Sequence, residues 1–390
     1  MTEVIGPGST IGILGAGQLG RMLAISARQM GYRVAVFGGD RHSPCGQVSD
    51  QTWDADFEDQ DQLEEFAAAV DVVTYEFENV PALTAAITSA RKPLRPGVRL
   101  LETAQNRLRE KTELSKLGLK TARFRFVHSP TELSQARHDF GGRVILKSNT
   151  DGYDGKGQWA LSDSDDVKSI FENSKLESGL VEEHVELKYE LSVIAGRWSN
   201  GHCEFFDPIV NHHANHILDV SVSGATLVTP KIAQQSREIA RAILEHFDVV
   251  GVLCVELFLT ADGKLLVNEI APRPHNSGHL TIEACHCSQF ELQLRTICNL
   301  PPVALQRRTP SAAMANLLGQ HLPNNWTAEA LQGLTIPESH LHLYGKQHRQ
   351  TGRKMGHLTV TGCDADLTEK TVRRVRNHLA SAAELETPPE

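Results

Sequence analysis

Short apolar runs that alternate with amphipathic segments predict a strand–helix–strand pattern at the start of the chain. Strands are expected at Thr10–Leu14, Arg33–Phe37 and Asp71–Glu76. Between the first two, a glycine-rich turn leads into a helical segment that carries Met22 and Leu23. Strands that are connected through a helix lie parallel in one sheet, so this region predicts a βαβ domain.

The pattern changes after Lys92–Gly97, a proline-containing segment that is expected to end the first domain. Helices are then expected at 105–117, Ser236–Phe247 and Glu283–Leu300, and strands at Val144–Lys147, Gly179–Glu183, Tyr189–Ile194 and Cys203–Phe206. Pro301–Pro302 and Arg307–Pro310 mark a second boundary, and the chain beyond them is again mixed. The pattern predicts a protein of the α/β and α+β classes with domains at 1–100, 101–300 and 301–390.

Composition fits a globular protein of more than one domain. The chain has 390 residues, of which 40% are hydrophobic and 22% charged, and this length exceeds one ordinary core. The net charge of −9 disfavours a nucleic-acid partner, because such partners are held through their phosphates. No apolar run is long enough for a membrane span, and the first residues lack the features of a signal peptide. The seven cysteines are scattered without a Cys-x-x-Cys pair, so a cytoplasmic location is expected.

Two apolar segments near residue 260 each carry one glutamate. Glu256 and Glu269 lie on either side of the turn Ala261–Lys264, and two strands joined by such a turn form a hairpin that brings the carboxylates side by side. Adjacent carboxylates repel unless a cation lies between them, and oxygen ligands without thiolates favour magnesium over zinc. The alternative is a charged edge hairpin that faces solvent.

The glycine turn after the first strand matches the dinucleotide fingerprint. Gly15, Gly17 and Gly20 have the spacing G-x-G-x-x-G, and Asp40 follows the next strand where a ribose-binding acid is expected. Glycines let the backbone approach a phosphate, and a helix N-terminus offers free N–H groups to it. The motif alone leaves three interpretations open: a dinucleotide site, a site for another phosphate, or tight packing.

A second glycine-rich segment, Asp151–Gln158, follows the strand that ends in Lys147. A glycine hairpin can fold over a polyphosphate while a lysine on the preceding strand neutralises its charge. The Gly-Lys-Ser/Thr ending of a P-loop is absent, and a plain surface loop is the alternative. The connector Glu182–Val185 can present backbone groups to an adenine edge, and Glu190 is a candidate for ribose hydroxyls.

The run Asn211–His216 contains the histidines His212, His213 and His216. Such a trio suggests a metal site, but no second cluster of ligands has the matching spacing. We therefore favour solvated or hydrogen-bonded histidines over a dedicated metal centre.

Taken in order, these motifs resemble the N5-carboxyaminoimidazole ribonucleotide synthetases of the ATP-grasp superfamily. The resemblance extends from about residue 10 to 360 and covers nearly the whole chain. It is carried by Gly15–Met22, Val73–Pro81, Gly152–Gln158, Asn268–His279 and Gly352–His357.

The resemblance implies a fold and an activity. The expected architecture is an N-terminal Rossmann-like pre-ATP-grasp domain, a central two-lobed ATP-grasp and a small C-terminal domain that closes the ribonucleotide site. The implied reaction uses ATP and bicarbonate to carboxylate the exocyclic amine of 5-aminoimidazole ribonucleotide, through carboxyphosphate, in de novo purine (IMP) biosynthesis. ATP and Mg²⁺ are the implied cofactors, the substrates are small molecules, and a homodimer is expected, with neither nucleic acid nor membrane as a partner.

Site residues follow from the same resemblance. The implied magnesium ligands are Glu256 and Glu269, and the implied catalytic residues are Arg273, His275 and Lys346. The implied ribonucleotide contacts are Gln18, Tyr153, Asp154, Arg273, Asn276, Lys346 and Arg353. The implied ATP contacts are Arg107, Lys147, Gly152, Tyr153, Asp154, Gly155, Lys156, Gly157, Gln158, Glu182, Glu183, His184, Val185, Glu190, His213, Asn268 and Glu269. The run Asn211–His216 around His213 departs from the family pattern.

Three other functions are compatible with parts of the sequence. The ATP-grasp motifs also suit another carboxylase or ligase of that superfamily. The glycine turn suits a nicotinamide-dependent oxidoreductase, and the nucleotide motifs suit a non-catalytic nucleotide sensor. Neither of the last two explains the motifs at the C-terminal end of the chain.

Overall fold

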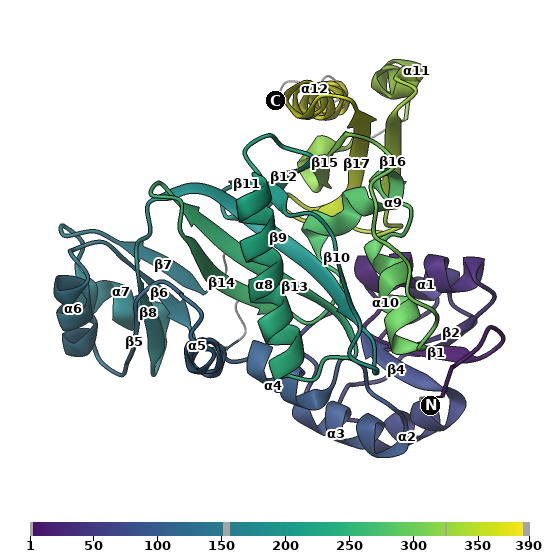
Figure 1. Cartoon of the computed structure of the whole chain (residues 1–390), viewed down its shortest axis with the longest axis horizontal. Helices are drawn as coiled ribbons and strands as arrows, with labels where there is room; N and C mark the ends of the chain where they lie inside the picture. Colours follow the sequence, from purple (N-terminus) through teal and green to yellow (C-terminus); the bar gives the residue numbers. More distant parts are fainter. Residues whose placement is uncertain (1–2, 151–156, 324–325, 385–390) are drawn as a thin grey trace.

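The computed structural model describes residues 3–150, 157–323 and 326–384. Three sheets organise this part of the chain, and helices cover them (Figure 1). The N-terminal sheet and a small antiparallel sheet lie at opposite ends of a nine-stranded sheet in this view. The expected three-part architecture of mixed α and β is confirmed. Among the described residues, no helix combines the length and apolar composition that crossing a bilayer requires.

The N-terminal sheet is parallel, with the strand order β3-β2-β1-β4. Every residue of the inner strand β1 and of the edge strand β4 is buried, as expected when helices cover both faces of a parallel sheet. This confirms the predicted βαβ pattern. The elements are β1 (Thr10–Leu14), α1 (Gln18–Gln29), β2 (Arg33–Phe37), β3 (Gln51–Trp53), α2 (Gln60–Ala69), β4 (Val72–Tyr75) and α3 (Ala82–Arg91), with the 3₁₀ turn Gly46–Val48 before β3.

Two helices lead from this domain to the small antiparallel sheet, whose order is β5-β8-β6-β7. Helices α6 and α7 pack together on this sheet over a core of their own. The elements are α4 (Val98–Ala104), α5 (Arg107–Lys116), β5 (Phe124–Val127), α6 (Pro130–Asp139), β6 (Val144–Ser148), β7 (Gln158–Leu161), α7 (Val167–Ser174) and β8 (Gly179–Glu183).

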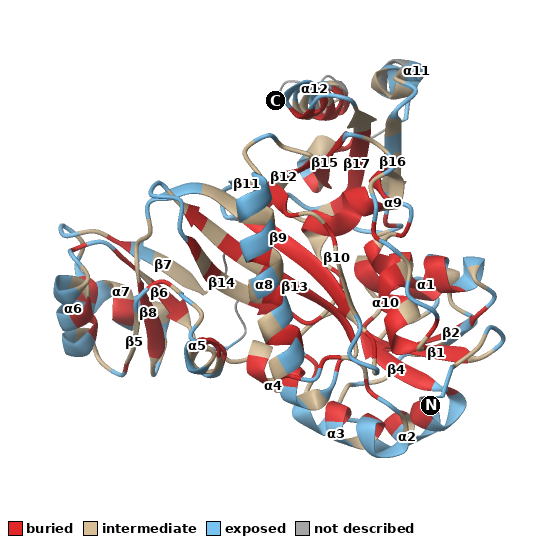
Figure 2. Ribbon diagram, in the orientation of Figure 1, coloured by how far each residue is buried: buried red, intermediate tan, exposed pale blue. Residues whose placement is uncertain are grey.

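The nine-stranded sheet forms the centre of the molecule, with the order β14-β13-β9-β11-β12-β15-β17-β16 and β10 beside β9. Helix α8 lies across it, and Figure 2 shows α8 exposed on its outer side while the strands beneath are buried. The central elements are β9 (Leu187–Arg197), β10 (Cys203–Phe205), β11 (Ile209–Ala214), β12 (Ile217–Ser223), α8 (Pro230–His246), β13 (Gly251–Thr260), β14 (Leu265–Ala271), the 3₁₀ helix η2 (Asn276–Leu280), α9 (Thr281–Ala284) and α10 (Gln289–Ile297).

The C-terminal strands continue this same sheet. β15 pairs with β12 over four residue pairs from Val220↔Ala315 to Ser223↔Ala312. Asp219 accepts hydrogen bonds from Arg373 and Arg376 of the last helix, the first at 2.6 Å. Main-chain and side-chain bonds therefore join the final segment to the centre. Its elements are β15 (Ser311–Leu318), η3 (Gly319–His321), α11 (Ala328–Leu331), η4 (Gln332–Thr335), β16 (Ser339–Leu343), β17 (Lys354–Gly362) and α12 (Ala365–Glu384).

Two predicted helices differ from the observed ones, the first in where it begins and the second by an interruption. The segment 105–117 begins only at Arg107, because Asn106 caps α5 by accepting a hydrogen bond from the backbone of Arg109. The predicted helix Glu283–Leu300 is wrong as one element, since α9 ends at Ala284 and α10 starts at Gln289. Between them Cys285 pairs with Arg307 as an isolated bridge, and Ser288 caps α10. The spacing of apolar residues alone does not reveal such a helix N-cap.

The glycine turn before α1 binds a carboxylate of the protein itself. The backbone N–H groups of Gly17 and Gly20 donate to the two carboxylate oxygens of Glu76, the second at 2.7 Å. Asp40 accepts from the backbone of its own turn, at residues 42 and 43. Of the three interpretations of this turn, these contacts favour tight packing, because Glu76 accepts hydrogen bonds from the amides that a phosphate would need. The oxidoreductase hypothesis depended on these same amides binding a dinucleotide, so it loses this support.

Replacing Gly15 with alanine is expected to destabilise the protein by at least about 2 kcal/mol. Gly15 has φ +103°, and an added Cβ would lie 2.5 Å from Glu76 Cγ and 2.8 Å from the Phe77 ring. Gly6→Ala is the control, since an added Cβ there meets nothing within 4 Å. Urea unfolding of the two variants measures the difference, and equal midpoints would contradict the close packing of Glu76 against the turn.

Candidate functional site

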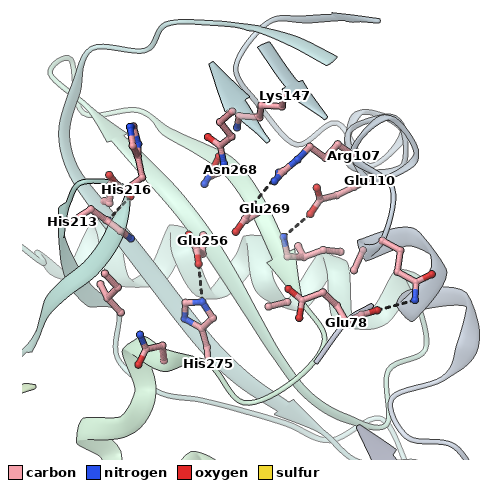
Figure 3. Close-up of a pocket in the computed structure, with 18 of the residues that line it drawn as sticks. Glu78, Arg107, Glu110, Lys147, His213, His216, Glu256, Asn268, Glu269 and His275 are labelled. Atoms are coloured by element: carbon pink, nitrogen blue, oxygen red, sulfur yellow. Dashed lines mark hydrogen bonds and ion pairs between the residues drawn. The ribbon is translucent and has the colours of Figure 1, made fainter. Parts of the chain in front are cut away.

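A cavity of about 690 Å³ lies where the three sheets meet. It is lined from the N-terminal domain, from α5 and the small sheet, and from strands β13 and β14 of the large sheet (Figure 3). Most of the predicted site residues line it together: Gln18, Arg107, Lys147, Gln158, Glu182, Glu183, His184, Val185, Glu190, His213, Glu256, Asn268, Glu269, Arg273, His275 and Asn276.

The remaining predicted residues lie elsewhere or outside the described part of the chain. Gly152, Tyr153, Asp154, Gly155 and Lys156 fall within 151–156 and are not described. Gly157, Lys346 and Arg353 are described but do not line the cavity. Lys346 Nζ donates to the carbonyl of Lys354 at 2.7 Å, and Lys354 itself is a lining residue. Arg353 Nη1 donates to the carbonyl of His348 at 2.7 Å.

Glu182 lies between two buried lysines. Its carboxylate is 2.8 Å from Lys147 Nζ and 3.1 Å from Lys111 Nζ, and all three side chains are at most 5% exposed. Burial alone would raise the pKa of Glu182, but the charges of Lys147 and Lys111 lower it to about 2. Burial also lowers the pKa of Lys147, and Glu182 opposes that effect. The cluster carries one excess positive charge, which suits an anionic ligand in the cavity.

The predicted hairpin exists as β13 and β14, and it pairs Glu256 directly with Glu269. A β-bulge follows Glu256 in this pairing. Each carboxylate has a cationic partner: Glu269 lies 3.1 Å from Arg107 Nη1, and Glu256 lies 2.8 Å from His275 Nε2 (Figure 3). Burial opposes the charge of Glu256, but His275 outweighs it and lowers the Glu256 pKa to about 2. Two charged carboxylates therefore face one cavity from adjacent strands.

Arg273 and Asn276 follow β14 along the cavity wall. Arg273 donates to both oxygens of Glu78, through Nε and, at 2.9 Å, through Nη2. Such a bidentate pair fixes the plane of the guanidinium group. Asn276 has its amide oxygen and nitrogen buried without a hydrogen-bond partner among the described residues. A buried unpaired amide costs free energy, so it is well suited to a polar ligand.

Of the three histidines at β11 and its turn to β12, His213 and His216 line the cavity and His212 does not. His213 Nδ1 lies 3.0 Å from Glu190, whereas His212 Nε2 lies 3.6 Å from Glu369 on α12. Burial would lower the pKa of His213, but the hydrogen bond and charge of Glu190 raise it. No group of three or more potential ligands has metal-binding geometry within the part of the chain that the structure describes.

Comparison with known proteins assigns the family. Three family models match successive parts of the chain: the ribonucleotide synthetase preATP-grasp domain over 9–105, the ATP-grasp domain over 112–290 and the phosphoribosylaminoimidazole carboxylase C-terminal domain over 312–371. The N5-carboxyaminoimidazole ribonucleotide synthase of Bacillus subtilis (strain 168) is 40% identical over 359 residues, which cover 92% of this chain and 92% of that protein. The chain belongs to the N5-carboxyaminoimidazole ribonucleotide synthetase family.

Solved structures of this family have the same fold. An ADP complex of an N5-carboxyaminoimidazole ribonucleotide synthetase is 37% identical, with a TM-score of 0.91 over 98% of this chain and 100% of that chain. The Aspergillus clavatus synthase in complex with ADP and 5-aminoimidazole ribonucleotide is 31% identical, with a TM-score of 0.86 over 96% of this chain and 99% of that chain. A bifunctional purine synthesis protein of Dictyostelium discoideum is 40% identical over 377 residues, but the chain spans only 37% of that longer protein.

Sequence reasoning missed two ionisable residues near the cavity, Glu110 and Lys111. Arg107, Glu110 and Lys111 lie at helical spacing on one buried face of α5, and only Arg107 was predicted to act. Glu110 accepts from the backbone N–H of Ile270 at 2.5 Å. Burial raises the pKa of Glu110 to about 8, and Lys111 only partly opposes this. Three ionisable side chains at spacing i, i+3, i+4 on a helix without a matching apolar face were the signal.

Proposed function

We propose that the protein uses ATP and bicarbonate to carboxylate the exocyclic amine of 5-aminoimidazole ribonucleotide. One observation carries the proposal: the Glu256–Glu269 pair, the lysine cluster around Glu182 and the Arg273–His275 segment all face one cavity. One relative, the Aspergillus clavatus synthase, binds ADP and 5-aminoimidazole ribonucleotide together in a solved structure. A carboxylase that activates bicarbonate with ATP needs both ligands in one site.

The nucleotide is expected to lie between the small sheet and β14. Lys147, Arg107 and the glycine segment Gly152–Gln158 would neutralise its phosphates. The connector Glu182–Val185 would contact the adenine through the backbone, because the Glu182 side chain is occupied by the two lysines. Glu190, His213 and Asn268 would contact the remaining polar groups of the nucleotide, since all three line the cavity.

The hairpin carboxylates fit magnesium. Glu256 and Glu269 offer oxygen ligands from paired strands, and magnesium is held in such sites by one or two carboxylates together with substrate phosphates. When bound, the ion would supply charge neutralisation at the phosphate oxygens. Arg107 and His275 hold these carboxylates in place.

The acceptor side of the cavity is formed by Arg273, His275 and Asn276. Arg273 has the fork geometry for a dianionic carboxyphosphate, and Glu78 orients that fork. Asn276 would use its unpaired amide on the aminoimidazole, and Tyr153 and Asp154 would act from the glycine segment. Gln18, Lys346 and Arg353 would bind the ribonucleotide phosphate by their side chains, since the glycine-turn amides are used by Glu76. No covalent enzyme nucleophile is required, so positioning and electrostatics would supply the rate.

The biological setting follows from this reaction. We propose a role in de novo purine synthesis, in the cytoplasm, as a homodimer. The seven free cysteines of the chain agree with a reducing compartment. The division into domains at 1–100, 101–300 and 301–390 is kept as a proposal.

Release of ADP tests the reaction directly. Purified protein with MgATP and bicarbonate should release ADP much faster when 5-aminoimidazole ribonucleotide is added, with appearance of the N-carboxylated product. ADP release that is indifferent to the ribonucleotide would point to another acceptor and overturn the proposal. Binding of ATP without any turnover would indicate a nucleotide sensor instead.

A further inference from the structure

His275 is attached to a line of buried hydrogen bonds that leads away from the cavity. Its Nδ1 lies 2.9 Å from Ser277 Oγ, and Ser277 Oγ lies 2.7 Å from Ser192 Oγ. The side-chain nitrogen of Asn211 donates to Ser192 Oγ at 3.1 Å. Ser221 Oγ donates to the side-chain oxygen of Asn211 at 2.8 Å. Ser277, Ser192, Asn211 and Ser221 are called the serine–asparagine chain below.

The serine–asparagine chain crosses four elements that are distant in sequence. Ser277 lies on η2, Ser192 on β9, Asn211 on β11 and Ser221 on β12. The three serines are fully buried, and Asn211 is 5% exposed. Polar groups buried this deeply are costly unless they are paired, and here every link has a partner. The chain is therefore a continuous, internally satisfied network that ends at one ring nitrogen of His275.

The Nε2 atom and the backbone of His275 also have hydrogen-bond partners. Its Nε2 lies 2.8 Å from Glu256 on the cavity side (Figure 3). Its backbone N–H donates to Gln289 Oε1 at 2.8 Å, and its carbonyl accepts from Gln289 Nε2 at 2.7 Å. Gln289 thus fixes the main chain, while the ring itself is held at Nδ1 by Ser277, at Nε2 by Glu256 and by an interaction with the Cys254 thiol. The hydrogen bond at Nδ1 is the one that connects the ring to the serine–asparagine chain.

We propose that the serine–asparagine chain positions His275 for catalysis by holding its imidazole plane through Nδ1, so that Nε2 stays directed into the cavity. The inference rests on the proposed function, because it assigns His275 to the acceptor side of that reaction. None of the four residues lines the cavity, so they act through His275 and not on substrate. Residues that hydrogen-bond to a catalytic side chain orient that side chain. If the catalytic side chain is misplaced, the rate of the chemical step falls.

Ser192→Ala tests the proposal, because it removes the central hydroxyl without touching the cavity. We expect kcat for ribonucleotide-dependent ADP release to fall by about 10- to 100-fold, while KM for MgATP stays within about twofold. Ser236→Ala is the matched control: it removes a buried serine hydroxyl on α8 that has no hydrogen-bond partner among the described residues. Its kcat should equal that of the wild type. Equal kcat values for Ser192→Ala and Ser236→Ala would overturn the proposal.

Two further measurements keep the test decisive. If Ser192→Ala does not fold, Ser221→Ala at the far end of the chain should lower kcat by a smaller factor, and an unchanged kcat would overturn the proposal. A crystal structure of whichever variant folds should show the His275 ring turned away from its contact with Ser277. An unchanged ring would overturn the inference. This outcome is separate from the test of the proposed function, which fails if wild-type ADP release does not respond to the ribonucleotide.

Discussion

Replacing Glu269 with glutamine is expected to lower ATP turnover by roughly 10³-fold or more, because a magnesium ligand contributes several kcal/mol of charge stabilisation. Glu269 faces Glu256 across the hairpin and lines the cavity. In the native protein, Arg107 Nη1 donates to Glu269 Oε2 at 3.1 Å. Glutamine has nearly the same shape and keeps an oxygen that can accept this hydrogen bond. The fold should therefore persist while the charge at the proposed ion site is lost. ADP release and thermal unfolding of the same sample measure the two effects.

Asp262→Asn is the control for the charge change. Asp262 lies in the turn of the same hairpin, where its 57% exposed side chain pairs with Lys264 in solvent. Removing this carboxylate alters the net charge equally but leaves the cavity untouched, so turnover should match the wild type. Full turnover in Glu269→Gln would contradict the magnesium assignment, whereas equal losses in both variants would indicate a general effect of charge.

The features that local pattern decides were predicted well. Strands β1 and β4 are wholly buried, and continuous apolar runs are what such strands require. The Glu256–Glu269 pairing followed from two apolar strands and a turn that contains Gly263, which has φ +79°. In both cases the sequence pattern that predicts the strands lies within a few consecutive residues. This is why the hairpin and its carboxylates could be predicted without any tertiary contact.

Partners that are distant in sequence could not be predicted. Glu76 reaches the glycine turn across 59 residues, so a motif typical of phosphate sites binds an internal carboxylate. Lys111 reaches Asn268 across 157 residues and also meets Glu182. Spacing along the chain predicts which residues share a helix face or a strand edge. It does not predict which buried charged residues will pair with each other. Those pairings depend on how the three sheets come together.

The Glu182 cluster provides the largest expected effect on stability. Glu182→Ala leaves Lys147 and Lys111 as buried ammonium groups without this carboxylate, and breaking a buried ion pair from one side costs about 3–5 kcal/mol. Glu183→Ala is the matched control on the next residue. Its carboxylate pairs with Arg123, which is 58% exposed, and such surface pairs contribute less than about 1 kcal/mol. Urea unfolding at neutral pH should separate the two variants clearly.

The pH dependence identifies the charge as the cause. Burial opposes ionisation of Glu182, but Lys147 and Lys111 lower its pKa from 4.5 to about 2 in the folded protein. A carboxylate with a lowered folded pKa stabilises fully above its unfolded value and loses that contribution as the pH falls through the folded one. The difference in unfolding free energy between wild type and Glu182→Ala should therefore be constant above about pH 4.5 and shrink toward pH 2. A difference that does not change across this window would show that lost packing, and not the ion pair, destabilises the variant.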